Sequence, residues 1–148
     1  MGYKLGLLPF IVLIISLFSP ALGFDSFEII DHRQKEMKIA QTLTRDINAK
    51  LLVNDFTGAV TSAQKIVTWS RNLRQLFPEG SEASVQNLSS ASSDIWENPK
   101  AFQKAIDTSE KMATDLFNAL SEGQLEEAKL IGSKLPLTCS ACHQRFRN

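Results

Sequence analysis

Apolar side chains recur at spacings of three and four residues in four segments of the chain, which predicts four amphipathic helices. The segments are residues 26–53, 56–77, 99–122 and 124–148. In the first segment, the expected inward face holds Phe27, Ile30, Met37, Ala40, Thr44, Ile47 and Leu51. In the third, it holds Phe102, Ile106, Met112 or Ala113, Leu116 and Leu120. Each helix can therefore bury one side against the others.

Residues that interrupt helices separate the later segments. The sequence PEG at 78–80 ends the second helix. Residues 81–94, SEASVQNLSSASSD, are too polar and aperiodic for a core helix and predict a long loop. Loops of this length are often functional. Asn98 is expected to cap the third helix, with Pro99 at its first position, and Gly123 ends it.

Strand signals are missing from the sequence. No segment alternates apolar and polar residues over the length of a strand, and no glycine-rich phosphate loop or repeat is present. Four helices of about 20–28 residues, joined by short turns except for one long loop, predict an all-α, antiparallel four-helix bundle.

The N-terminus has a different character from the rest of the chain. Lys4 gives it a basic start, residues 5–18 are an uncharged apolar run, and Ala21 and Gly23 are small residues at cleavage positions. This pattern predicts a secretory signal peptide at residues 1–23, since the run is shorter than the ~20 residues of a spanning helix. We expect a single domain at residues 24–148, exported to the periplasm, with no membrane attachment after cleavage.

Charge gives no argument for an anionic partner. The chain has 16 Lys and Arg against 16 Asp and Glu, so removal of Lys4 leaves 15 against 16. A near-neutral chain lacks the basic excess that binds nucleic acid or anionic membranes. We expect neither as a partner.

The only two cysteines, Cys139 and Cys142, precede His143 in a C-x-x-C-H motif. At about 100° per helical residue, the three side chains leave one face of the last helix within about a third of a turn. Two thiols so placed can bond to the two vinyl groups of a haem, and the imidazole can donate a nitrogen to its iron. The motif predicts one covalent haem c near the C-terminus of the last helix.

Three other interpretations of the cysteine pair are weaker. A zinc site needs four ligands, and His32 is the only other His or Cys in the chain. A thioredoxin-like dithiol is expected in a βαβ setting, which this chain lacks. A structural disulfide is compatible with export, but its three-residue loop would constrain the unfolded chain little.

The whole mature chain resembles the class II c-type cytochromes, the cytochrome c-prime family. HRQKEMK at 32–38 resembles the Arg-Gln-x-x-Met-Lys element of that family's first helix, LFPEGSE at 76–82 the end of its second, and IWENPKAF at 95–102 the entry to its third. CSACHQRFR at 139–147 matches its haem site. The resemblance is strongest to the low-spin branch, in which Met and His both bind the iron.

The resemblance implies roles for three further residues. Met37 lies at the position that faces the iron from the distal side, where it is expected to be the second axial ligand. Arg147 is expected against the proximal imidazole and the haem rim, and Arg33 is expected to pair with a haem propionate. The alternative for Met37 is a packing role, with a five-coordinate iron. Pro136 is expected to kink or break the last helix.

These residues favour a soluble periplasmic one-electron carrier with a His/Met-ligated haem and redox partner proteins. The alternative is a five-coordinate haem protein that binds nitric oxide or carbon monoxide, and a weaker third hypothesis is a haem-free protein with a disulfide. Nothing in the sequence resembles a nucleophile, a base or a substrate pocket, so we do not expect an enzyme. A homodimer through the first two helices is implied by the resemblance alone.

Overall fold

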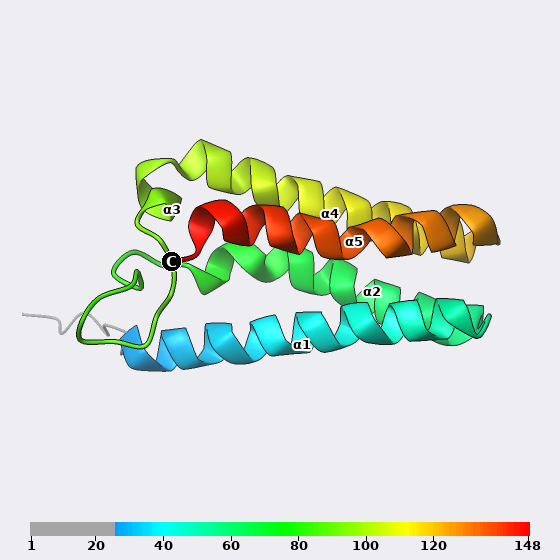
Figure 1. Ribbon diagram of the computed structural model, residues 1–148, viewed down its shortest axis with the longest axis horizontal. Coiled ribbons are helices and arrows are strands. Elements are labelled where there is room, and N and C mark those ends of the chain that lie inside the picture. The colour runs from blue at the N-terminus through cyan, green and yellow to red at the C-terminus, as the bar shows by residue number, and fades with distance from the viewer. Residues whose placement is uncertain (1–25) are drawn as a thin grey trace, which may run out of the picture.

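The computed structural model describes residues 26–148, which form a bundle of four long helices (Figure 1). In chain order, the elements are α1 (Ser26–Leu52), α2 (Phe56–Asn72), the 3-10 helix η1 (Leu73–Leu76), α3 (Asp94–Glu97), α4 (Pro99–Ser121) and α5 (Leu125–Phe146). The predicted signal peptide, residues 1–23, lies outside the described residues.

Each long helix runs antiparallel to the one before it (Figure 1). The predicted all-α, antiparallel four-helix bundle is confirmed. The long loop, the start of α1 and the end of α5 lie together at one end of the bundle, and the short turns between α1 and α2 and between α4 and α5 lie at the other. In residues 26–148, no helix has the length and apolarity needed to cross a membrane.

The helix ends follow local chemistry, with one exception. The Asp55 side chain accepts a hydrogen bond from the Gly58 N–H at 3.0 Å and so caps α2. Gly123, at φ +73°, takes the left-handed conformation after α4 that glycine favours. The predicted side-chain cap by Asn98 is wrong, because the Asn98 amide instead donates a hydrogen bond to the carboxylate of Asp94.

Two clusters of buried side chains form the core. The first fills the part of the bundle near the short turns and consists of Ala40, Ile47, Leu51, Ala59, Ala63, Ile66, Val67, Ala113, Leu116, Ala119, Leu120, Ala128 and Leu135. The second lies near the long loop and consists of Leu73, Leu76, Ala91, Ile95, Phe102, Ile106 and Phe146. Most predicted inward residues are buried, but Phe27 is 59% exposed and that prediction is wrong. Helical spacing predicts which face of a helix is apolar, but it does not show whether neighbouring helices extend far enough to cover that face at the helix end.

The helix α5 continues through Pro136 without a break from Leu125 to Phe146, so the predicted break is wrong. A proline ring in a helix clashes with the backbone four residues earlier and removes one hydrogen bond. That earlier residue is Gly132, which also faces α1. A Cβ at Gly132 would lie 2.6 Å from Cδ1 of Leu51, so the missing side chain lets α1 and α5 approach here.

Candidate haem site

The three motif residues line one cavity at the long-loop end of the bundle. Cys139, Cys142 and His143 all border this cavity, which has a volume of about 890 Å³. The prediction that they share one face of the last helix is therefore confirmed. Both cysteine side chains are partly buried, and Cys142 packs against the second core cluster.

The cavity wall opposite α5 is made by α1, and the other elements close its sides. The helix α1 contributes Arg33, Met37 and Thr44 among others, so Met37, the predicted distal residue, and Arg33, the predicted propionate partner, border the same cavity as His143. Apolar walls come from Trp69, Leu73, Phe77, Ile95, Phe102 and Phe146. Residues 88–91 of the long loop complete the lining. This arrangement leaves an apolar space between His143 on one helix and Met37 on another.

Burial raises the pKa of both thiols, that of Cys142 to about 11 with a further contribution from the charge of Cys139. A reactive dithiol has the opposite property, because its nucleophile is a thiolate of lowered pKa. The structure therefore argues against a redox dithiol. No disulfide joins Cys139 to Cys142, and residues 26–148 contain no group of three His, Cys, Asp or Glu side chains that could hold a metal ion.

The environment of His143 favours its neutral imidazole, although the residue is partly open to solvent. Burial lowers the pKa of His143, and the positive charge of Arg147 lowers it further. A neutral imidazole has the free lone pair that a metal ligand requires. The Arg147 backbone N–H donates to the His143 carbonyl oxygen at 3.2 Å, and the predicted contact of its side chain with the imidazole and the haem rim stays a prediction. The side chain of Arg147 itself is exposed.

Arg33 is buried and its donors are directed at the polypeptide. Nη1 donates to the Leu76 carbonyl oxygen at 3.1 Å and to Ser81 Oγ at 2.7 Å. Nη2 donates to the Ser81 carbonyl oxygen at 2.7 Å and to Ser89 Oγ at 2.8 Å. These four bonds use every N–H of the two terminal nitrogens, so only the Nε–H is left for the predicted haem propionate.

The residues fit a haem in volume, polarity and donor type. The cavity volume falls within the range of about 300–1,000 Å³ found for cofactor pockets, and its walls are mainly apolar. Its lining also includes Trp69, whose Nε1–H is buried without a hydrogen-bond partner. A buried donor without a partner is rare in proteins, and here it can be satisfied by a polar group of a bound molecule. No local signal in the sequence identifies the free donor of Trp69.

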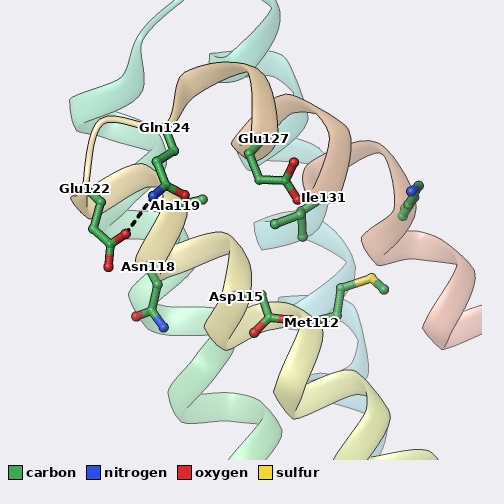
Figure 2. Close-up of a pocket in the computed structure, with 9 residues that line it drawn as sticks. Met112, Asp115, Asn118, Ala119, Glu122, Gln124, Glu127 and Ile131 are labelled. Carbon is green, nitrogen blue, oxygen red and sulfur yellow. Dashed lines mark hydrogen bonds between the residues drawn. The ribbon is translucent and has the colours of Figure 1, made fainter.

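A second hollow, of about 480 Å³, lies between α4 and α5 at the opposite end of the bundle (Figure 2). Its rim is polar, and Figure 2 shows the Gln124 amide donating to the Glu122 carboxylate, at 2.9 Å. Neither cysteine nor histidine is among its lining residues. Among the described residues, the cysteines and the histidine that could bind a haem therefore line the first cavity and not the second.

Comparisons with known proteins agree with this geometry. A family model described as Cytochrome C' matches residues 28–147. Cytochrome c' from Rubrivivax gelatinosus has a similar structure, with a TM-score of 0.73 and 18% sequence identity over 83% of this chain and 97% of that one. No curated protein sequence matches this chain.

Two further solved structures have the same fold. One is a cytochrome c' described as having an unusual ligand-controlled dimer dissociation, with a TM-score of 0.76 and 18% identity over 84% of this chain and 98% of that one. The other is a nitric oxide complex of a mutant cytochrome c prime from Alcaligenes xylosoxidans, with a TM-score of 0.72 and 17% identity over 82% of this chain and 94% of that one.

Proposed function

The chain belongs to the cytochrome c' family, whose model spans residues 28–147, and from this premise we propose that it binds nitric oxide or carbon monoxide at a haem iron. The family carries a covalently attached c-type haem. The observation that carries the proposal is that Cys139, Cys142 and His143 line one large apolar cavity of this cytochrome c' fold.

The electron carrier with a His/Met-ligated haem, expected from the sequence, is wrong. The family match is to cytochrome c', and the similar structures include nitric oxide complexes of cytochrome c prime. Cytochrome c' typically holds a five-coordinate, high-spin iron, which supports the gas-binding alternative. The prediction of redox partner proteins stays a prediction.

Each motif residue has a distinct task in holding the cofactor. Cys139 and Cys142 would hold the porphyrin through two thioether bonds, and the imidazole of His143 would bind the iron. When bound, the haem would supply an iron able to coordinate a diatomic gas. The helix α1 forms the side of the cavity opposite α5, with the thioether of Met37 as a bulky apolar group on the wall. We propose that Met37 crowds this side and limits the ligands to small molecules.

The test is an absorption spectrum of the haem-loaded protein, oxidised and dithionite-reduced, followed by addition of carbon monoxide. We expect broad high-spin bands that shift when the gas is added. Sharp low-spin bands that carbon monoxide leaves unchanged would overturn the proposal.

Met37→Ala tests the crowding role in the same protein. Removing the thioether should speed carbon monoxide association by about tenfold or more, a change of roughly 1.4 kcal/mol in barrier. Met112→Ala is the matched control, because Met112 lies on α4 against the first core cluster and lines the second hollow, at the other end of the bundle. If both variants associate with the gas at the wild-type rate, Met37 does not crowd the iron.

Three further properties belong to the proposal. We place the protein in the periplasm after removal of residues 1–23, as a binding protein and not an enzyme. We also propose a homodimer, since α1 and its end expose apolar side chains such as Ile39, at 48%, and Leu52, at 85%. Sedimentation of the haem-loaded protein with and without carbon monoxide tests the dimer, and a monomer in both conditions would exclude it.

A further inference from the structure

Arg33 is the only charged side chain that is buried in residues 26–148, at 5% exposure. Burial lowers the pKa of Arg33, but a guanidinium remains charged in a protein. The ion pairs of the described residues do not include Arg33. A buried cation without an anion is costly, so the groups around it must compensate its charge.

The compensating groups belong almost entirely to the long loop between η1 and α3. The guanidinium binds two carbonyl oxygens and two hydroxyl groups, of which all but the Leu76 carbonyl come from Ser81 and Ser89. Its carbon also lies 4.7 Å from the centre of the Phe77 ring, where the ring face attracts a cation. One side chain of α1 therefore bonds to both halves of the loop.

The other contacts of the loop are mainly hydrogen bonds: Gln34 of α1 donates to the Leu88 carbonyl oxygen at 2.9 Å, and within the loop the Asn87 amide donates to the Glu82 carbonyl oxygen at 3.0 Å. Its apolar residues Val85 and Leu88 are 96% and 76% exposed, so burial of apolar surface contributes little there. Its second attachment is to the residues that follow His143, where the Ser92 N–H donates to the Phe146 carbonyl oxygen at 3.0 Å and the Asn148 N–H to the Ser90 carbonyl oxygen at 2.9 Å. The loop thus connects α1 with the end of α5 across the mouth of the haem cavity.

The loop segment held by Arg33 lines the cavity. Leu88, Ser89, Ser90 and Ala91 border it together with Met37 and His143. We propose that Arg33 is a positioning residue: through Ser81 and Ser89 it holds the loop so that residues 88–91 form a fixed wall of the haem cavity, and it thereby sets the rate at which a gas enters. The claim that Arg33 controls gas entry rests on the proposed function. The claim that Arg33 positions the loop rests on the hydrogen bonds alone.

The experiment uses the haem-loaded protein and four variants, Arg33→Lys among them. Arg33→Met removes the charge and the donors but keeps an apolar stem. Ser89→Ala removes one acceptor of the guanidinium, together with the Ser89 hydrogen bonds to Ser81 and Ala91 within the loop, and leaves α1 unchanged. Lys35→Met is the matched control, since Lys35 lies on the same helix in an exposed ion pair with Asp31. Hydrogen exchange of the amides in residues 81–91 reports the loop, and flash photolysis of the carbon monoxide complex reports gas entry.

We expect exchange of residues 81–91 to speed up at least tenfold in Arg33→Met, because several charge-assisted hydrogen bonds are lost. Carbon monoxide association should accelerate in the same variant. Ser89→Ala should show both changes to a smaller extent, and Lys35→Met neither. Arg33→Lys should give exchange and association rates between those of Arg33→Met and the wild type, because an ammonium group cannot reproduce the planar fork.

Unchanged exchange in Arg33→Met would overturn the positioning role, and faster exchange with an unchanged association rate would overturn the control of gas entry. If Arg33→Met does not fold, Arg33→Lys decides both points, since it keeps the positive charge and loses the planar fork of donors. A wild-type protein that does not bind carbon monoxide would refute the proposed function. The exchange measurement would still test whether Arg33 positions the loop.

Discussion

Replacing Gly132 with alanine tests the close approach of α1 and α5 beside the haem cavity. The new Cβ would lie 2.6 Å from Leu51 Cδ1 and 3.3 Å from Asn48 Oδ1, both on α1. Leu51 is 4% exposed in the first core cluster, so its side chain has little room to move away. The contact must be relieved by a shift of the Leu51 side chain within a packed core or by a shift of one of the two helices.

Two opposing effects set the size of the change. Alanine is favoured over glycine inside a helix by about 1 kcal/mol. Overpacking of a filled core costs about 1–3 kcal/mol. We expect Gly132→Ala to lower the free energy of unfolding by about 1 kcal/mol, which corresponds to roughly 4 °C in Tm for a domain of this size.

The double variant separates these effects. In a Leu51→Ala background, which by itself costs about 2–5 kcal/mol, the space beside residue 132 is open. Gly132→Ala should then stabilise the protein by about 1 kcal/mol, which gives a coupling free energy near 2 kcal/mol between the two positions. Urea unfolding of the haem-loaded protein, followed by circular dichroism, measures all four members of the cycle. Ser133→Ala, on the exposed face of α5, is the control and should change stability by less than about 0.5 kcal/mol.

An equal effect of Gly132→Ala in both backgrounds would refute this reasoning. It would mean that Leu51 does not limit the approach of α5, and that Gly132 is present for another reason. A stabilised single variant would lead to the same conclusion.

Three further predictions concern the haem and the pH dependence of stability. His143→Ala should keep the haem attached through its thioethers on a denaturing gel but lose the wild-type reduced spectrum, and added imidazole should restore that spectrum; loss of the haem itself would contradict the assigned roles. Replacing Cys139 and Cys142 together with serine should leave a haem that acidified organic solvent extracts, whereas extraction should fail for the wild type. Hydrogen bonds from Lys50 and Ser62 lower the pKa of Asp46 below its ordinary value of 3.8, so this carboxylate stabilises the fold above that value and the stabilisation is lost as pH falls through the folded pKa. Ser62→Ala should therefore cost about 1 kcal/mol at pH 7 in urea unfolding, with a smaller difference near pH 2, and a pH-independent difference would exclude the linkage.

Much of the fold could be predicted because it is encoded locally. The periodicity of apolar residues gave the four long helices, and the 100° step of a helix placed Cys139, Cys142 and His143 on one face. The glycine after α4 and the proline at its first position are signals that lie next to the ends they mark. Such features depend on residues that are close together in the sequence, so they can be predicted from the sequence alone.

The errors arose where a partner distant in sequence decides the outcome. The Gly132 that accommodates Pro136 also faces Leu51, which belongs to another helix. The partners of Arg33 lie 43–56 residues away, in a loop whose position the sequence does not reveal. The iron ligation of Met37 depends on the separation of α1 and α5, which helical spacing cannot supply. The prediction of an electron carrier is overturned by the family match, although the haem was predicted.

The two core clusters give the bundle two ends that should respond differently to protein engineering. The second cluster includes Ile95, Phe102 and Phe146, which also line the haem cavity. A single substitution at one of these residues should therefore change both the thermal stability of the protein and the surroundings of the haem. Ile47 and Leu116 belong to the first cluster and do not border that cavity. The usual trade-off between stability and activity should therefore be confined to the long-loop end. A designer could repack the other end for heat tolerance and leave gas selectivity intact.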